Sequence, residues 1–356
     1  SPSYAGAVSL NINEILKISK YRKHTTVFGN TSYKVKFNHK YKNINLKKKL
    51  FQSQNKKYVE EFIRLEKINN SDLIELHNRP IYLKYLNKEL KNKTYLLYFH
   101  NDPLTMSGSK TISERIFLLK NCFKIIFNSN WSKKRFLEDL DKFYQKSDKL
   151  EVIHQSINKT KVNINNKKKI ITFVGKLNSA KGYDVFGKAV IKILNKYKDW
   201  KAIVIGDERR ENIIFKHNNL KIYGFKDNKF ILNYLKKVSI SVVPSKWDEP
   251  FGRTSLEAAS RGSAVIISNK GGLPETSKAA IILTKVDKKT LFNEIEKLIT
   301  NKKLLAKKQK ENFNEFYLTH NYVSNLIDNI RSQYLTEVFS IVRRKKNLRI
   351  MHITNF

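Results

Sequence analysis

Short apolar runs alternate along most of the chain with longer segments in which apolar residues recur every three or four positions. The short runs have the length of β-strands, and the periodic segments are typical of amphipathic helices. Their alternation predicts an α/β protein with parallel sheets. In the second half the expected strands are Ile170–Val174, Lys201–Ile205, Leu220–Tyr223, Ser239–Val243 and Ala264–Ser268. The helices expected between them are Gly182–Asn195, Asn228–Lys236 and Thr254–Arg261. This half of the chain is therefore predicted to form a doubly wound domain.

The first half follows the same logic less regularly. The expected strands are Ser71–Glu75, Tyr95–Phe99, Lys124–Phe127 and Leu150–Ile153, and the expected helices are Val8–Ile18, Ser113–Lys120 and Ser132–Leu140. The segment Tyr21–Phe37 is compatible with two short strands or with a hairpin. A second doubly wound domain is expected here.

The order of the elements is unusual at both ends. A doubly wound domain normally begins with a strand that lies centrally in its sheet, but here a turn-forming stretch, Ser1–Gly6, runs directly into a helix. The last residues form a short apolar run that resembles such an opening strand. We hypothesise that Arg349–Ile353 supplies the missing central strand and that the chain is circularly permuted relative to its fold. An edge strand, a tail or the start of a second tandem unit are the alternatives.

Composition sets the broad class. The chain has 356 residues, of which 40% are hydrophobic, which is enough for two cores of common size. The apolar runs are far shorter than a membrane span, and no signal peptide is recognised. The single cysteine, Cys122, excludes an internal disulfide and favours a reducing compartment, so we expect a cytoplasmic protein with Cys122 as a small buried hydrophobe.

The formal net charge of +39 allows two interpretations. A basic surface can bind nucleic acid or an anionic membrane. The lysines are spread along the whole length, however, and this favours a general preference for Lys, Asn and Ile. Weak, peripheral association with the inner face of a membrane could still follow. No motif of basic and aromatic residues indicates nucleic-acid binding.

The residues that carry chemistry are concentrated in the second half. Backbone amides at the start of a helix can hold a phosphate, and the segment from Glu249 to Glu257 (EPFGRTSLE) has a glycine, Gly252, just before a predicted helix. Thr254 or Ser255 could cap that helix. Glu257 in its first turn could accept both hydroxyl groups of a ribose, and Glu249 could hold the other end of the same ligand. Taken alone, the segment is equally compatible with a capped helix that carries two solvated glutamates.

Two further segments favour ligand binding. Gly175 and Lys176 follow a predicted strand, and Lys181 lies just beyond them, where α/β sheets bind ligands. Two cations at this position could neutralise a diphosphate. Gly271 and Gly272 follow another strand, and their glycines permit a tight turn or the close approach of a ligand.

These residues resemble the retaining GT-B glycosyltransferases of the family-4 type (glycosyl transferases group 1). The family signature of two glutamates separated by seven residues appears as Glu249 and Glu257, with Pro-Phe-Gly after the first. The family's Gly-Arg-Leu…Lys-Gly element appears as Gly175-Lys176-Leu177…Lys181-Gly182, with lysine replacing arginine, which keeps the charge but loses the bidentate fork. Gly-Gly-x-Pro-Glu matches in full at residues 271–275, and the opening Ala5-Gly6 resembles the family's first glycine-rich loop.

The resemblance implies two Rossmann-like domains that face each other across a cleft. Residues 1–153 with 322–356 would form the acceptor-side domain, and residues 154–321 would bind the nucleotide-sugar. His100 at a strand end would approach the transferred sugar, with Glu249 and Lys181 as its catalytic partners. The other implied donor contacts are Ala5, Gly6, Gly175, Lys176, Phe251, Gly252, Arg253, Thr254 and Glu257. His77 and Arg79 would lie on the acceptor side, and His154 is interpreted as structural.

The function expected from this resemblance is transfer of a hexose from a UDP- or GDP-sugar to a glycan or a lipid-linked acceptor, in the synthesis of lipopolysaccharide or another cell-envelope glycan. No prosthetic group and no metal are expected, because no Asp-x-Asp sequence stands out at a strand end. Three alternatives stay open. They are a GT-B sugar-nucleotide epimerase, a phosphorylase and, from a different class, a basic nucleic-acid-binding protein.

Overall fold

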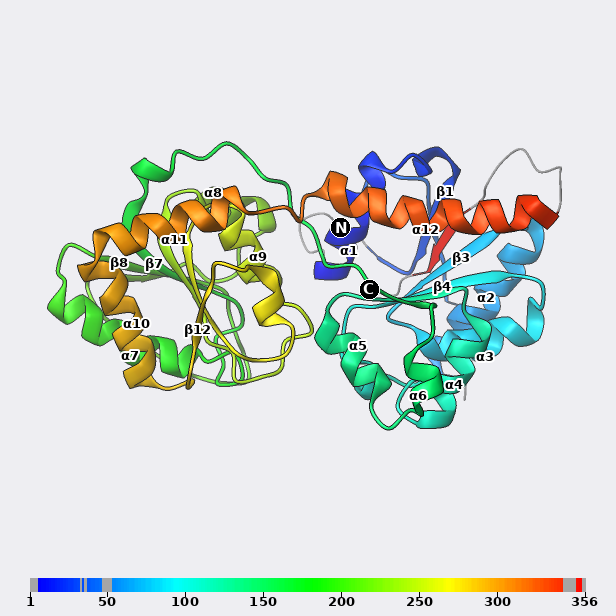
Figure 1. Cartoon of the computed structure of the whole chain (residues 1–356), viewed down its shortest axis with the longest axis horizontal. Helices are drawn as coiled ribbons and strands as arrows, with labels where there is room; N and C mark the ends of the chain where they lie inside the picture. Colours follow the sequence, from blue (N-terminus) through cyan, green and yellow to red (C-terminus); the bar gives the residue numbers. More distant parts are fainter. Residues whose placement is uncertain (1–5, 33, 35–36, 47–52, 342–349, 354–356) are drawn as a thin grey trace. The chain divides into compact units, whose positions relative to one another are not determined.

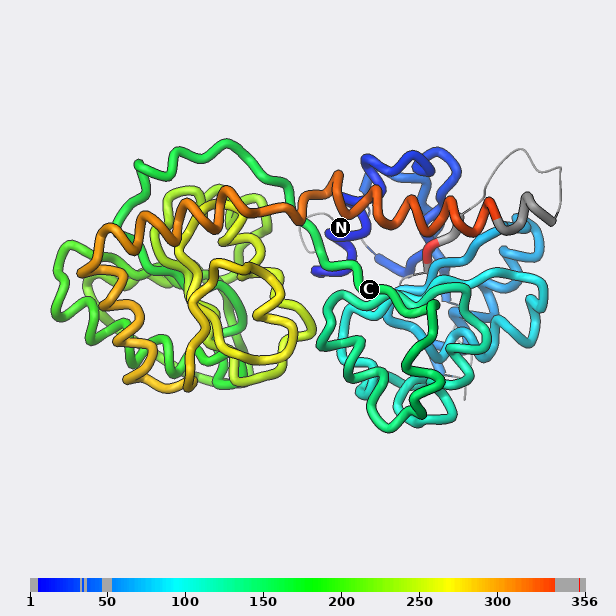
Figure 2. The backbone as a smooth tube through the Cα atoms, in the orientation of Figure 1, coloured from blue at the N-terminus to red at the C-terminus, as the bar shows by residue number. Residues whose placement is uncertain are grey.

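The computed structural model describes the chain except for residues 1–5, 33, 35–36, 47–52, 342–349 and 354–356. The chain divides into two compact units (Figure 1). The first unit comprises Ser1–Ser156 and His320–Phe356, and the second comprises Ile157–Thr319. In the backbone trace of Figure 2 the chain leaves the first unit once and returns to it once. Each unit contains one sheet, and every strand pair in both sheets is parallel. The predicted α/β class is confirmed.

The first unit is built on a sheet of seven described strands. In spatial order they are β2 (Tyr41–Asn43), β1 (Thr25–Gly29), β13 (Ile350–Ile353), β3 (Leu73–His77), β4 (Thr94–Phe99), β5 (Lys124–Phe127) and β6 (Leu150–Val152). Its helices are α1 (Ala7–Ile18), α2 (Gln54–Asn69), α3 (Pro80–Glu89), α4 (Ile112–Asn121), α5 (Asn130–Leu137), α6 (Lys142–Gln145) and α12 (His320–Ile341), with short 3-10 turns η2 (Arg22–His24) and η3 (Pro103–Thr105).

The last strand of the chain lies in the middle of this sheet. β13, red in Figure 1, pairs with β1 on one side and with β3 on the other. His352 stands opposite Val27 of β1 and Glu75 of β3. The predicted central position of this strand is confirmed, and the circular permutation itself stays a prediction.

The segment predicted as two short strands or a hairpin has a different structure. Among the described residues of Tyr21–Phe37 there is one strand, β1, after the turn η2, and the next described strand, β2, begins at Tyr41. β1 and β2 pair in parallel, with Val27 opposite Tyr41, so a hairpin is wrong. Parallel pairing requires a connection that returns the chain to the same end of the sheet. The alternation of apolar residues within the strands does not predict such a connection.

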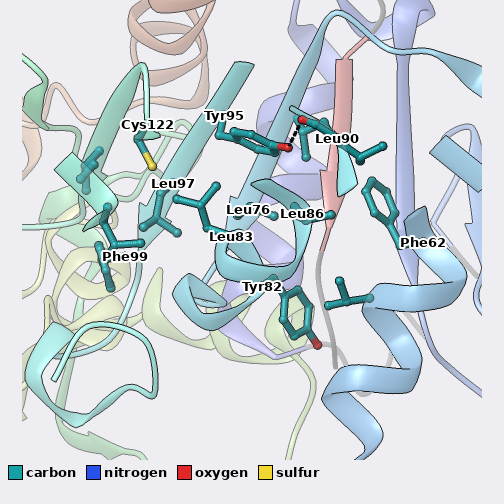
Figure 3. Close-up of a cluster of buried hydrophobic side chains, with 14 of the residues drawn as sticks. Phe62, Leu76, Tyr82, Leu83, Leu86, Leu90, Tyr95, Leu97, Phe99 and Cys122 are labelled. Carbon is teal, nitrogen blue, oxygen red and sulfur yellow. Dashed lines mark hydrogen bonds between the residues drawn. The ribbon is translucent and has the colours of Figure 1, made fainter. Parts of the chain in front are cut away.

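The core between the sheet and α2, α3 and α4 is rich in leucine and aromatic residues (Figure 3). Leu83 and Leu86 of α3 belong to the same buried cluster as Leu97 of β4. The Tyr95 hydroxyl lies within this cluster and donates to the Leu90 carbonyl oxygen over 3.0 Å, which satisfies its polar atom. Cys122 is buried here as expected, and burial raises the pKa of its thiol to about 12.

The second unit is a doubly wound domain with six described strands. In spatial order they are β12 (Ile281–Leu283), β11 (Ala264–Ser268), β10 (Val238–Val243), β7 (Lys168–Val174), β8 (Lys201–Ile205) and β9 (Leu220–Ile222). Its helices are α7 (Tyr183–Lys196), α8 (Asn228–Leu235), α9 (Arg253–Ala259), α10 (Lys288–Thr300) and α11 (Lys302–Asn314), with 3-10 turns η4 (Ile164–Asn166) and η5 (Leu273–Thr276).

Both faces of this second sheet are covered. On β7, Ile171 and Phe173 belong to one buried cluster, whereas Ile170 and Val174 belong to the cluster on the other face. Burial on both faces explains why its strands are almost continuously apolar in sequence. No helix among the described residues is long and apolar enough to cross a membrane.

Candidate donor-binding site

The loop between β7 and α7 is fixed by glycines in the left-handed region. Gly182, at the N-terminus of α7, has φ of 72°, and a Cβ there would lie 1.9 Å from the Pro244 carbonyl oxygen. Gly206, after β8, has φ of 147°, and its Cβ would lie 1.8 Å from the Gly175 carbonyl oxygen. Only glycine fits such contacts with backbone. The loops after β7, β8 and β10 therefore pack directly on one another at the carboxyl end of the sheet.

This packing brings Lys181 to Glu249. The amides of Lys246 and Trp247 donate to the Ala180 carbonyl oxygen over 2.9 and 3.0 Å, which fastens the β10 loop to the loop that carries Lys181. The Lys181 Nζ atom lies 2.5 Å from Glu249 Oε1. Lys181 remains 33% exposed, whereas Glu249 is 12% exposed, so the pair lies at the surface with its carboxylate mostly covered.

The two glycines after β11 hold the Glu249 backbone. Gly271 forms an isolated parallel bridge with Glu249, and the Gly272 amide donates to the Glu249 carbonyl oxygen over 2.6 Å. Gly271 has φ of 59°, and a Cβ there would lie 2.1 Å from that same oxygen. These two glycines thus allow the backbone of the loop after β11 to pack closely against the backbone of Glu249.

The segment after Glu249 enters α9 differently from what the sequence predicts. Gly252 is the N-cap residue, with φ of 114° and no side-chain capping hydrogen bond. Thr254 or Ser255 was expected to cap, but both lie inside the helix, and the Ser255 hydroxyl is 2.6 Å from that of Thr276. Glu257 lies one turn beyond Arg253, past the first turn of the helix. Because α9 has only seven residues, its dipole is a weak basis for phosphate binding.

Arg253 and Glu257 form a partly buried pair on α9. The Arg253 Nε atom donates to Glu257 Oε1 over 3.0 Å, and Asn228 of α8 donates to the same oxygen over 2.7 Å. The Arg253 Nη1 atom is buried, and the arrangement leaves this donor without a hydrogen-bond partner in the part of the chain that the structure describes.

The remaining predicted donor contacts differ in their exposure. Lys176 is exposed and Thr254 is half-buried. The Phe251 side chain is only 1% exposed and belongs to the core, so it can serve a ligand only through its backbone. Gly6 is an exposed N-cap residue of α1 with ordinary backbone angles and open space around it. Ala5 lies outside the described residues.

The histidines predicted for the acceptor side lie in the first unit. His100 follows β4, and its backbone amide donates a hydrogen bond to Asn78 Oδ1 over 2.7 Å. This bond fixes the His100 backbone. His77 ends β3 and is 5% exposed, and its two ring nitrogens lie 3.0 Å from His100 Nε2 and 2.9 Å from His352 Nδ1. With both nitrogens engaged, His77 does not fit a direct contact with an acceptor. Arg79 is the N-cap residue of α3 and donates to the Asn78 carbonyl oxygen over 3.0 Å.

Burial explains the protonation state of these rings. Burial lowers the pKa of His100 to about 4, and burial together with the neighbouring His352 and His100 lowers the pKa of His77 well below 6.5. Both rings are therefore neutral at pH 7.

Sequence reasoning missed two residues in these arrangements. Asn228, which holds Glu257, carries no signal beyond its place after a helix cap at Asp227. His352 was predicted as part of a strand but not as a partner of His77, because 275 positions separate the two residues. A histidine in a strand expected at the centre of the sheet was the available signal.

Residues 154–316 match the model of the family described as glycosyl transferases group 1. An uncharacterized 42.6 kDa protein in the cps region of Klebsiella pneumoniae is 29% identical over 209 residues, which are 52% of each chain. The lipopolysaccharide core biosynthesis mannosyltransferase LpcC of Rhizobium leguminosarum is 29% identical over 28% of this chain and 31% of its own. The matched regions thus span about half or less of these curated relatives.

Solved structures extend the similarity to both units. The Anabaena protein Alr3699/HepE in complex with UDP superposes with a TM-score of 0.73 at 17% identity, over 92% of this chain and 96% of that one. At this identity the likeness concerns the fold, which is the GT-B fold. Residues 154–316 are thus similar to the glycosyl transferases group 1 family, and both units share the GT-B fold of solved glycosyltransferase structures.

Proposed function

We propose that this chain is a retaining glycosyltransferase that moves a hexose from a nucleoside-diphosphate sugar to an acceptor hydroxyl. The observation that carries the proposal is the ion pair of Lys181 and Glu249, 2.5 Å apart, at the carboxyl end of the second sheet. A cation and a carboxylate side by side match the two ends of such a donor, since an ammonium binds phosphate oxygens and a carboxylate accepts from sugar hydroxyls. The match of this unit to the family model supports the same assignment.

Donor binding would exchange the partners of this pair. A diphosphate would take over Lys181 from Glu249, and Glu249 would then accept hydrogen bonds from the sugar. Arg253 would contribute its Nη1 atom to the phosphates, and Lys176 would add positive charge nearby. Glu257, oriented by Asn228, would accept from the ribose hydroxyls. Preformed hydrogen bonds to Glu257 lower the entropy lost when the donor is held.

Retention of configuration follows from attack on the face that the leaving group vacates. The acceptor oxygen would bond to the anomeric carbon while the bond from that carbon to the phosphate oxygen breaks. The departing phosphate oxygen would take the proton of the acceptor hydroxyl. Lys181 and Arg253 would stabilise the negative charge that develops on the diphosphate, and His100 would contact the transferred sugar. We assign no step to a metal ion.

The relatives suggest the setting of the reaction. One of them is a lipopolysaccharide core biosynthesis mannosyltransferase, and this supports a glycan of the cell envelope as the product class. The UDP in the Anabaena structure makes a uridine nucleotide the first donor to test. The charge of +39 supports a lipid-linked acceptor at an anionic membrane surface, approached from the cytoplasm.

The proposal is tested by thermal unfolding with and without UDP, GDP and their glucose and mannose conjugates. One family of donors is expected to raise the unfolding temperature, because a ligand that binds only the folded state stabilises it. The Lys181→Ala variant is expected to lose most of this rise. Lys188→Ala is the matched control, since Lys188 is exposed on α7, the helix that follows Lys181, and is expected to keep the rise. Stabilisation that is equal in the two variants would contradict the phosphate role of Lys181.

A further inference from the structure

Two neighbouring loops at the carboxyl end of the second sheet are bonded to each other. The lysine loop, residues 175–182, follows β7 and carries Lys181. The clamp loop, residues 206–211, follows β8, which pairs with β7. The backbones of the two loops meet where the Leu177 amide donates to the Asp207 carbonyl oxygen over 3.3 Å. Side chains then extend this junction toward Lys181.

Asn178 connects the clamp loop to Lys181. Its Nδ2 atom donates to Glu208 Oε2 over 2.8 Å, and its Oδ1 atom accepts from the Lys181 amide over 3.0 Å. Asn178 is 8% exposed and the Glu208 side chain is 6% exposed, so both contacts are largely shielded from water. Shielded polar groups are costly to leave without their partners. The backbone of Lys181 is therefore tied to Glu208 through one side chain.

Glu208 is an ionised acceptor that its own loop holds in place. Its Oε1 atom accepts from the backbone amides of Arg209 and Arg210, both over 3.1 Å. The Arg210 guanidinium donates to both carboxylate oxygens over 3.0 and 2.9 Å. The hydrogen bonds from Arg210, joined by that from Asn178, hold the pKa of Glu208 well below its usual range. At pH 7 Glu208 therefore only accepts hydrogen bonds.

The orientation of the Asn178 amide follows from both of its partners. Because Glu208 only accepts, Asn178 must present its NH2 group to that carboxylate. Because the Lys181 backbone N–H only donates, Asn178 must present its oxygen there. The two requirements agree. Aspartate has the same shape as asparagine, but it would meet the second requirement and not the first.

A second carboxylate of the clamp loop holds the next residue of the lysine loop. Glu211 Oε2 accepts from the Ser179 amide over 2.9 Å and from the Ser179 hydroxyl over 2.5 Å. The Ser179 carbonyl oxygen accepts in turn from the Gly182 amide over 3.0 Å. The lysine loop is thus held at two successive side chains, and from this held backbone the Lys181 side chain reaches Glu249.

We infer that Asn178 and Glu208 are positioning residues, which hold the Lys181 backbone so that its ammonium lies where a donor diphosphate binds. The inference rests on the proposed function for the identity of the ligand, whereas the clamp itself rests on the hydrogen bonds described. A lysine side chain has several rotatable bonds, so the place of its ammonium depends on a fixed backbone. Misplacement of a substrate-positioning group by about 1 Å can cost about a hundredfold in rate.

Hydrogen exchange tests the clamp without a substrate. Asn178→Asp places a second carboxylate within 2.8 Å of Glu208, and like charges at this distance repel. Amide hydrogens of residues 176–182 are expected to exchange about tenfold faster in this variant, because local opening becomes easier. Asn218→Asp is the matched control, since Asn218 is exposed in the same unit and the substitution adds the same charge. Unchanged exchange in Asn178→Asp, or an equal increase in the control, would overturn the inference.

A second substitution should restore the clamp. When Asn178→Asp is combined with Glu208→Gln, the new amide at position 208 can donate to the new carboxylate at position 178. That carboxylate still accepts from the Lys181 amide, so the bridge re-forms with one bond reversed. Exchange in the double variant is expected within about threefold of the unmodified protein and slower than in Asn178→Asp, which is a non-additive result. Additive effects of the two substitutions would refute the direct bond, and circular dichroism establishes that each variant folds.

UDP binding tests whether Asn178 acts through Lys181. By calorimetry, Asn178→Asp is expected to raise the Kd of UDP about tenfold, and the double variant is expected to recover most of this loss. In a Lys181→Ala background the same Asn178→Asp substitution should change the Kd less than about twofold, because the ammonium it displaces is already absent. An equal loss in both backgrounds would show an effect of charge or loop stability alone and would overturn the positioning role.

The two measurements separate the clamp from the proposed function. If neither UDP, GDP nor their sugar conjugates bind the unmodified protein, the proposed function fails and the role toward the donor fails with it. Hydrogen exchange then still decides whether Asn178 and Glu208 hold Lys181. If UDP binds the unmodified protein and Asn178→Asp equally well, the proposed function stands and the positioning role is overturned.

Discussion

At the scale of single residues, backbone contacts made by glycine determine where the charged groups of the second unit lie. Glu249 is placed by the Gly271 bridge and by the Gly272 amide, and Lys181 is placed by the loop that ends at Gly182. The sequence shows that glycine occurs at these positions, but not which backbone each glycine must approach. The distances to Pro244 and Glu249 supply that information, and they make the placement testable.

Gly271→Ala is expected to destabilise the second unit by about 1–3 kcal/mol and to weaken stabilisation by UDP. Its Cβ would lie 2.1 Å from the Glu249 carbonyl oxygen, so the Glu249 backbone must move. Gly224→Ala is the matched control. Gly224 has a similar φ of 65° but open space around it, so the substitution carries the backbone strain without the clash. Thermal unfolding with and without UDP measures both effects, and an equal loss of UDP stabilisation in the two variants would contradict this role of Gly271.

The buried histidines are expected to make stability fall in mild acid. The pKa of His100 is lowered to about 4 in the folded chain, against about 6.5 when unfolded, so the unfolded state binds more protons between these values. Stability from this group is therefore present above pH 6.5 and is lost as the pH falls toward 4, by up to about 3 kcal/mol. Urea unfolding at a series of pH values should show a smaller loss for His100→Gln than for the unmodified chain. An identical pH profile would rule out His100 as a source.

At the scale of elements, the hydrophobic periodicity of the sequence locates the helices and strands that are long or strongly apolar. Lys124–Phe127, Lys201–Ile205 and Ala264–Ser268 were predicted with the bounds that the structure shows. Four described helices of the first unit were missed, namely α2, α3, α6 and α12. α2 has many charged residues and a weak apolar stripe, and α3 begins at Pro80, a residue that also suits a turn. β2 is only three residues long and half-buried, so the sequence has no apolar run that would predict it.

The central position of β13 predicts that Met351→Pro unfolds the first unit selectively. In a central strand every backbone N–H belongs to one of the two hydrogen-bond ladders, and proline removes one and distorts the next, at a cost of about 3 kcal/mol or more. Met351→Ile keeps both ladders and is the control. Limited proteolysis followed by mass spectrometry should show cleavage within residues 6–156 while 157–319 stays protected. Protection of both units in the proline variant would contradict the paired, central position of this strand.

At the scale of the whole molecule, the α/β class could be predicted because each unit repeats the alternation of strand and helix, and the GT-B fold was implied by the resemblance of the glutamate and glycine motifs to a known family. The candidate donor-binding residues could be named through the same resemblance, because they are contiguous or follow predicted strands, and their role stays a prediction. The contacts of His77 with His352 and of Glu75 with Arg331 could not be predicted, because they join residues 275 and 256 positions apart. Long-range contacts of this kind depend on strand order, which local patterns leave undetermined.

The place of β13 in its sheet also has a consequence for synthesis on the ribosome. The ribosome completes the whole second unit before it makes the strand that joins β1 to β3. Until then, β1 and β3 each expose an unpaired strand edge with apolar neighbours, a state that invites pairing with other chains. The second unit can therefore fold during translation, whereas the first unit can close its sheet only after the second unit and β13 have emerged.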